Sequence, residues 1–424
     1  MGIFLKGHGN IDFLKVVKKQ RMMNDILKMH NVFFTIFRNI ASIIYKIFVY
    51  SEKYYYVSQG SAEKKVLFLF CHDVHTFRPD CTSMFIETAK VIDKENYDII
   101  ALKDKKGISF IFTFQLCKLV IIWLLTLIKE KIGISVGLYI LREAIDCYFA
   151  KMQISSLVNE SSIKLLVLFY DADSRDNYFS QYFQQLNIPT ATLQHGIQLA
   201  PRKGLEDNID FAGIEFGCFI SNYYLAWNEF TKEEAIKAGI KENQIKVLGI
   251  SKCIGINPLL KKENSNVIGL ILDGKYEEEN NIPMIRLLNQ LCVKYNIKYK
   301  LRYHPDYKGT EYLDYIDARY CIATNKRETL NDFLSSVKLC IVANSTVLFE
   351  LEFYSVPFIR YSSGNLKDKF VGYSGISFNN YEELEKCYLS IIKECVIVPR
   401  YMENIAYNYR RFFESFLSCK SNAK

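Results

Sequence analysis

The sequence lacks the patterns that mark disulfide-bonded, zinc-binding or secreted proteins. Its twelve cysteines include no Cys-x-x-Cys pair, and no signal peptide with a small-residue cleavage site precedes them. We therefore expect a cytosolic protein in which the cysteines act as small apolar residues. Internal repeats and low-complexity tracts are also missing, and with 50% hydrophobic and 24% charged residues the chain is expected to fold throughout.

Apolar runs of strand length alternate with helical segments along most of the chain, as in parallel sheets covered by helices. The runs lie at 65–71, 165–170, 190–193, 223–227, 245–249, 267–272, 298–303, 339–343 and 356–359. A polar segment, 251–266, interrupts the series and is interpreted as an interdomain linker. Since 424 residues suffice for two full cores, we expect an α/β protein with two Rossmann-like, doubly wound domains facing a cleft and a helical N-terminal extension.

Histidine is scarce, with six residues in the chain, and two of these six end an expected strand. His195 precedes Gly196, which permits a sharp turn, and His304 precedes Pro305, which ends the strand. Ligands of open α/β sheets bind beyond the carboxyl ends of the strands. We expect both histidines at a shared cleft, where His195 takes a proton from an acceptor hydroxyl and His304 donates to a diphosphate oxygen. A structural histidine bonded to backbone is the alternative for His304.

Other candidates for donor binding follow the second series of strands. Asn344, Ser345 and Thr346 stand where a strand passes into a helix, and hydroxyls and free N–H groups there suit a phosphate. Plain helix capping explains the same residues. Glu350 could bond a ribose hydroxyl, and Arg302 could add positive charge beside His304.

Each of two further loops can be interpreted either as a structural turn or as part of a ligand-binding site. The loop after 65–71 carries His72 and His75 and is expected at the same sheet edge as His195, which makes both candidates for acceptor binding. A solvated turn with incidental histidines is the plainer interpretation. Asp273-Gly274 is interpreted mainly as a turn, and otherwise as the floor of the cleft.

The N-terminal part is basic as well as apolar. Residues 1–50 contain eight Lys or Arg and two Asp, which give +6 of the net +8. Apolar residues recur at helical spacing over 32–48, which fits a helix on anionic lipid better than a nucleic-acid contact. An equally good interpretation of 32–48 is a helix that faces the core and has a solvated basic side. The most hydrophobic stretch, 107–128, has Gln115 and Lys118 at its middle and is expected as a buried or membrane-touching helix rather than a span.

Together, Gln194-His195-Gly196, the unit 223–249, His304-Pro305 and Asn344-Ser345-Thr346 with Glu350 resemble the GT-B-fold transferases of bacterial surface-polysaccharide synthesis. The nearest families are the teichoic-acid CDP-glycerol glycerophosphotransferases and the capsule Kdo and sialic acid transferases, and the likeness covers 165–361. It implies His195 as catalytic base, His304 as a ligand of the donor phosphate, a phosphate site at Ser345 and Thr346, and no metal or other cofactor. Sialyltransferases of this group have an acid-Gly motif where this chain has His195-Gly196, so the donor stays open.

The resemblance implies a metal-independent glycosyltransferase that moves a sugar from a nucleotide-sugar donor to a hydroxyl of a bacterial surface polysaccharide such as capsule or O-antigen. A polyol-phosphate (CDP-glycerol-type) transferase, a sugar-nucleotide epimerase and a non-catalytic subunit of a polysaccharide complex remain alternatives. The acceptor is expected to be a glycan or lipid-linked glycan, with no nucleic-acid partner. The expected location is cytoplasmic, with peripheral contact to the inner face of the plasma membrane as an option.

The expected divisions follow from these roles. They are a basic apolar helical segment at 1–64, an acceptor domain at 65–250, a nucleotide-donor domain at 266–400 and a C-terminal helix at 401–424.

Overall fold

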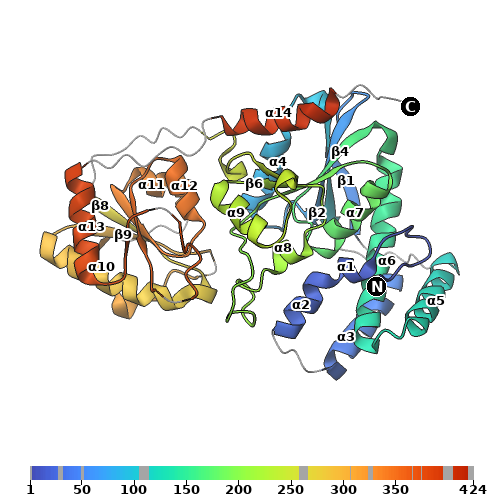
Figure 1. Ribbon diagram of the computed structural model, residues 1–424, viewed down its shortest axis with the longest axis horizontal. Helices are drawn as coiled ribbons and strands as arrows, with labels where there is room; N and C mark the ends of the chain where they lie inside the picture. Colours follow the sequence, from blue (N-terminus) through green and yellow to red (C-terminus); the bar gives the residue numbers. More distant parts are fainter. Residues whose placement is uncertain are drawn as a thin grey trace. The chain divides into compact units, whose positions relative to one another are not determined.

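The computed structural model describes residues 2–26, 32–48, 52–104, 114–256, 266–305, 307–322, 328–364, 366–373, 375–394 and 404–418. The chain divides into two compact units. Unit 1 comprises Met1–Ile254 and Asn404–Lys424, and unit 2 comprises Gly255–Glu403. Each contains a largely parallel sheet with helices packed against it (Figure 1), which confirms the expected α/β class. Most of the proposed linker (257–265) and the start of the hydrophobic stretch (107–113) lie outside the described residues.

Unit 1 is built on a seven-stranded sheet of order β1-β3-β2-β4-β5-β6-β7, parallel except for β1, which pairs antiparallel with β3. The strands are β1 Glu52–Ser58, β2 Lys65–Asp73, β3 Tyr97–Asp104, β4 Ile163–Leu168, β5 Thr190–Leu193, β6 Tyr223–Ala226 and β7 Ile245–Val247. The strand order reverses between β2 and β4, so the switch point of this sheet lies beside the loops that follow these two strands. Strands β1 and β3 were not expected from the sequence.

The helices of unit 1 cover the sheet on both sides. They are α1 Phe13–Val16, α2 Lys18–Ile26, α3 Val32–Phe48, α4 Pro79–Ala89, α5 Phe114–Lys129, α6 Ile134–Leu157, α7 Ser174–Gln185, α8 Ile214–Cys218, α9 Glu229–Lys237 and α14 Ile405–Leu417. The N-terminal residues are part of this unit, since Ile3, Leu5, Ile11 and Phe13 are buried in the same core as β2 and β4. None of the described helices is both long and apolar enough to cross a membrane.

The C-terminal helix α14 packs in unit 1, beside β2 and β4, where it carries its label in Figure 1. Phe413 meets Phe68 of β2 edge to face, with ring centroids 5.2 Å apart. Tyr409 is fully buried, and its hydroxyl donates to the carbonyl of Gly249 at 3.2 Å. Hydrophobic packing therefore ties the last described segment to the first unit.

Unit 2 has a six-stranded, all-parallel sheet of order β10-β9-β8-β11-β12-β13. Its strands are β8 Val267–Ile271, β9 Lys298–Arg302, β10 Cys321–Ile322, β11 Leu339–Val342, β12 Phe358–Tyr361 and β13 Ser377–Phe378, and its α-helices are α10 Asn281–Tyr295, α11 Leu330–Ser335, α12 Val347–Phe353 and α13 Tyr381–Glu394. This order is that of a dinucleotide-binding fold, with the switch point between β8 and β11.

Candidate functional site

Asp273 organises the switch point of unit 2. It directly follows the β8 region and is 1% exposed. Its Oδ1 accepts the backbone N–H of Asn344, which follows β11, and its Oδ2 accepts the amide of Asn280, both at 2.9 Å. Asn281 accepts the N–H of Asp273 at 2.9 Å and donates back to its carbonyl at 3.1 Å. Asp273 thus joins the loops after β8 and β11, where the sequence suggested mainly a turn.

Burial raises the pKa of Asp273 to about 6, although the bonds from Asn280 and Asn344 and the positive charge of Lys369 favour its ionised form. Asn344 also holds the loop after β12, because its amide donates to the carbonyl of Lys367 at 3.0 Å and accepts the N–H of Lys369 at 2.9 Å. The side chain of Asn344 is therefore engaged with the loop after β12, while its backbone N–H is bound by Asp273 of the loop after β8.

His304 lies over the backbone of Gly274. A Cβ added at Gly274 would come within 3.4 Å of His304 Cε1 and Nδ1, while the φ of −69° at this position is one that any residue adopts. The imidazole of His304 therefore lies at van der Waals distance from this position of the Asp273 loop. His304 and the Asp273 loop are adjacent in space although about thirty residues separate them along the chain.

The remaining donor-binding candidates are near the same edge of unit 2. Ser345 Oγ accepts the N–H of Val347 at 3.3 Å, and helix α12 after it has seven residues, so little helix dipole stands behind this site. Arg302 interacts electrostatically with Glu350 and Glu328, and its guanidinium donates to the carbonyl of Glu328 at 3.3 Å. Arg302 and Glu350, both predicted as donor ligands, are thus near each other.

In unit 1, the switch point carries a cluster of aromatic rings with two histidines. His72, in β2, stacks on Phe77 at 4.3 Å between centroids and meets Phe169, which follows β4, at 5.8 Å. His195, which follows β5, lies 5.0 Å from Phe169 and 4.4 Å from Tyr170. The sequence placed both histidines at this edge, and the structure brings them to the same ring cluster.

Both histidines are held neutral at pH 7. Burial lowers the pKa of His72 to about 4, against the opposing charge of Asp173. Burial also lowers the pKa of His195, opposed by the Glu215 carboxylate, and His195 Nδ1 is buried with no hydrogen-bond partner among the described residues. A neutral imidazole can accept a proton, so the protonation state required of a base is present.

His75, by contrast, is exposed. Its backbone N–H donates to Asp73 Oδ1 at 2.8 Å, which is the geometry of a turn closed by an aspartate. Of the two histidines predicted to bind the acceptor, His72 lies on a cavity and His75 does not line it.

That cavity has a volume of about 440 Å³ and opens at the carboxyl end of β2. Its wall combines carboxylates, hydroxyls and rings, from Glu52, Cys71, His72, Asp73, Thr76, Phe77, Leu102, Tyr139, Glu143, Asp146, Asp173, Ser174 and Arg175. Arg175 partly compensates the negative charge, since it lies 2.7 Å from Glu52 and 3.7 Å from Asp146. Carboxylates that accept hydrogen bonds beside flat aromatic faces are suited to a ligand rich in hydroxyl groups.

A smaller cavity of about 220 Å³ is lined by Tyr170, Lys19 and Glu215, among others. Lys19 sits 4.1 Å above the Tyr170 ring and 3.2 Å from Asp173. The basic N-terminal segment therefore supplies a cation to this edge of unit 1. Sequence reasoning did not find this contact, because it joins residues more than 150 positions apart.

The pair Asp171-x-Asp173 has the spacing of a metal-binding motif, but its first residue is used inside the protein. Asp171 is buried, and its Oδ2 accepts the N–H groups of Ile220 at 3.0 Å and Ser221 at 2.7 Å. Across the described part of the chain, no group of three or more His, Cys, Asp or Glu is arranged to hold a metal ion.

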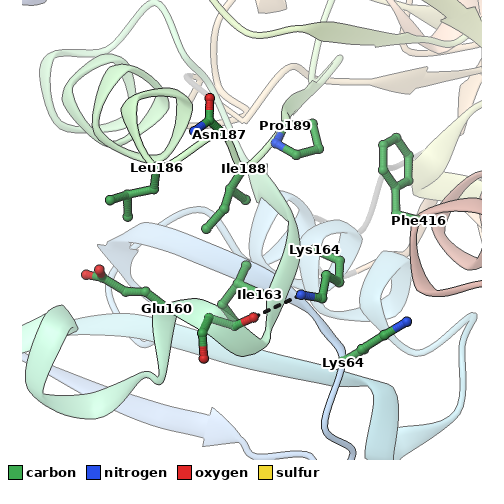
Figure 2. Close-up of a pocket in the computed structure, with 10 residues that line it drawn as sticks. Lys64, Glu160, Ile163, Lys164, Leu186, Asn187, Ile188, Pro189 and Phe416 are labelled. Carbon is green, nitrogen blue, oxygen red and sulfur yellow. Dashed lines mark hydrogen bonds between the residues drawn. The ribbon is translucent and has the colours of Figure 1, made fainter. Parts of the chain in front are cut away.

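A larger cavity, of about 570 Å³, lies at the opposite edge of unit 1 (Figure 2). It is lined near the starts of β4 and β5 by Ile163, Pro189 and Lys164, and by Phe416 of α14. The Lys164 ammonium donates to the carbonyl of Ser161 at 2.9 Å. This is the amino edge of a parallel sheet, and neither His72 nor His195 lines the cavity, so its size does not make it the reaction site.

Two α/β units with these strand orders form a two-domain fold of GT-B type. Solved structures of other proteins share this fold. The fold is similar to a UDP-GlcNAc 2-epimerase from Neisseria meningitidis solved with UDP-GlcNAc, with a TM-score of 0.50 and 12% identity over 84% of this chain and 100% of that one. It is similar to S. aureus MnaA, solved with UDP, with a TM-score of 0.50 and 11% identity over 84% and 98%. At such identities the likeness establishes the fold alone. No protein-family model and no curated protein matches the sequence.

Proposed function

We propose that this protein is a metal-independent enzyme that acts on a nucleotide sugar and transfers the sugar to a hydroxyl group of an acceptor glycan. The observation that carries the proposal is the chemistry at the two switch points. One has an aspartate-anchored set of loops beside a histidine, and the other has two neutral histidines beside a cavity of carboxylates and rings.

Unit 2 is assigned the nucleotide. His304 would donate to a diphosphate oxygen and stabilise the charge that grows on the leaving nucleoside diphosphate. Ser345 and Thr346 offer hydroxyl groups for the same phosphates, and Arg302 with Glu350 would bind nearer the ribose. In support, Asp273 and Asn344 fix the loops that carry these groups, so little ordering is left for the ligand to impose.

Unit 1 is assigned the acceptor. A hydroxyl-bearing ring would lie in the cavity of about 440 Å³ beside His72. His195 would take the proton of the attacking hydroxyl as that oxygen bonds to the anomeric carbon and the diphosphate leaves. The two assignments follow the expectation that ligands of open α/β sheets lie outside the carboxyl ends of the strands.

A nucleotide-sugar epimerase is the second candidate. It is favoured by the two similar structures, one an epimerase solved with UDP-GlcNAc and the other solved with UDP. In that case the carboxylates of the unit 1 cavity would move protons on the sugar itself rather than hold a separate acceptor.

The two candidates differ in what they do with donor alone. The purified protein should be incubated with UDP-GlcNAc and other nucleotide sugars, with and without an acceptor glycan, and followed by NMR. A transferase releases nucleoside diphosphate only when acceptor is present, whereas an epimerase forms a new nucleotide sugar without it. CMP released from CDP-glycerol would indicate the polyol-phosphate alternative.

Whichever reaction is found, substitutions of the two histidines test their roles in it. We expect His195→Gln and His304→Ala to lower kcat by about 10²- to 10⁴-fold, while the control Glu87→Gln, on the exposed side of α4, retains it. Equal melting midpoints for all three separate lost chemistry from lost folding. If full turnover survives in both histidine variants, the assignment is wrong, and if no nucleotide sugar is turned over under any condition, the enzyme proposal fails.

A further inference from the structure

Helix α5 has two apolar sides, of which the unit buries only one. Leu116, Val120, Trp123 and Leu127 are buried in the core of unit 1. On the other side, Ile121, Leu124, Leu125 and Ile128 are 37% to 70% exposed and follow helical spacing. The rotation of the helix is fixed, since the Trp123 indole N–H donates to the carbonyl of Lys6 at 2.9 Å. The second side therefore cannot turn into the core.

Helix α3 repeats this arrangement. Its inner side is held to α6, where Arg142 donates to Asn39 Oδ1 at 3.3 Å and Lys46 pairs with Asp146. Its outer side exposes large apolar residues at helical spacing, namely Phe37, Ile40, Ile44, Tyr45 and Phe48. The inner side also buries Ile43 in the core, so α3, like α5, has an apolar side that the unit does not cover.

The two outer sides belong to one region of unit 1. Both helices pack on α6, and Figure 1 shows the three together at one end of the unit. The first residue of α6, Ile134, is 71% exposed. We call these ten side chains, five from α3, four from α5 and Ile134, the α3–α5 face. They are ten of the twenty-three large apolar residues that are exposed in the described part of the chain, and such concentration marks a binding surface.

The charges on and beside the α3–α5 face are mostly positive, although Glu130 lies between Lys129 and Lys131 just after α5. Neither α3 nor α5 contains an Asp or Glu. Lys118, Lys129 and Lys131 are exposed on or just after α5, and Arg38 is exposed on α3. A second copy of the chain would bring these cations against one another, whereas an anionic phospholipid surface would neutralise them and take up the apolar side chains.

We propose that the α3–α5 face binds the interface of a membrane that contains anionic phospholipid, with both helices lying in the membrane plane. Helices of 16 and 17 residues suit this position, since a single span needs about 20 apolar residues. This inference goes beyond the proposed reaction and does not depend on it, because lipid binding is measured without substrate.

The test is flotation of the full chain with vesicles of phosphatidylcholine alone or mixed with phosphatidylglycerol. Wild type is expected to float with the mixed vesicles and to remain behind with phosphatidylcholine alone. Leu125→Gln with Ile128→Gln should weaken binding about tenfold or more, because two apolar side chains no longer enter the lipid. Lys129→Gln with Lys131→Gln should weaken it roughly 25-fold, at about 1 kcal/mol per lysine.

The matched control is Val293→Gln with Leu313→Gln, which changes two exposed apolar residues of unit 2 and should float like wild type. Since every substituted residue is exposed, melting midpoints should stay unchanged. Wild type that does not float, or apolar variants that float like wild type, would overturn the proposal. A dimer that sediments as monomer after Leu125→Gln with Ile128→Gln, without lipid binding by wild type, would assign the face to a second copy instead.

Discussion

Asp176 is a buried acid beneath the carboxyl edge of unit 1. It is fully buried, and its Oδ2 accepts the N–H of Tyr170 at 2.8 Å. Burial raises its pKa to about 8, although hydrogen bonding from Cys71 and Tyr170 favours the ionised form. The folded protein therefore holds a neutral carboxylic acid here at pH 7, supporting the loop that places Tyr170 against His195.

We predict that Asp176→Asn gains stability relative to wild type as the pH rises. The unfolded chain ionises this group near 3.8, so between pH 4 and 8 the unfolded state releases a proton that the folded state keeps. Wild-type unfolding free energy then falls across this window by about 5 kcal/mol, and asparagine, which cannot ionise, avoids the loss. Urea unfolding of wild type and variant at pH 5 and at pH 8 measures this change in relative stability. A difference between variant and wild type that is the same at both pH values would refute the buried neutral acid.

At this scale the sequence predicted some residues and missed others for a physical reason. His195 and His304 could be placed at strand ends because an apolar run before them and Gly196 or Pro305 after them are local signals. The role of Asp273 could not be predicted, since its partner Asn344 is 71 residues away. The contact of Lys19 with Asp173 was missed for the same reason, and His75 shares the sequence context of His72 but not its place on the cavity.

Among the elements, α14 stabilises a unit that is remote from it in sequence. Its helical period could be recognised from the sequence, but the period does not name the surface that the helix covers. The sheet edge shows a similar limit: β1 carries mixed polar and aromatic residues and half-buried positions, which give a weak strand signal, whereas the buried parallel strands of both units have strong ones.

We predict that Phe413→Ala lowers the free energy of unfolding of unit 1 by about 3–5 kcal/mol, the usual cost of removing a fully buried phenylalanine. Its ring is buried against Phe68. Tyr407→Ala on the same helix, where the side chain is 59% exposed, is the control and should cost well under 1 kcal/mol. Chemical denaturation of the full chain with a fluorescence probe in unit 1 gives both values, and equal costs would mean that α14 does not pack as described.

For the whole molecule, the order of strands and helices along the chain was enough to predict two α/β units. Where the N-terminal segment packs was not predictable, because α3 could equally have faced a core or a lipid. The structure shows that α3 faces the core of unit 1 along Asn39 and Ile43. Its opposite, apolar side is exposed, and this is the side that we propose contacts lipid. The division of nucleotide and acceptor between two switch points is the central claim at this scale.

The most direct test of that claim is a titration of the purified chain with UDP, GDP, CDP and CMP, followed by thermal unfolding. We predict that one nucleotide stabilises wild type, by about 2.7 kcal/mol at 100 times its Kd, that His304→Ala loses most of this stabilisation, and that the exposed control Asp314→Asn keeps it. If no nucleotide stabilises the protein, or if His304→Ala binds as well as wild type, the assignment of the nucleotide to the Asp273–His304 edge of unit 2 is wrong.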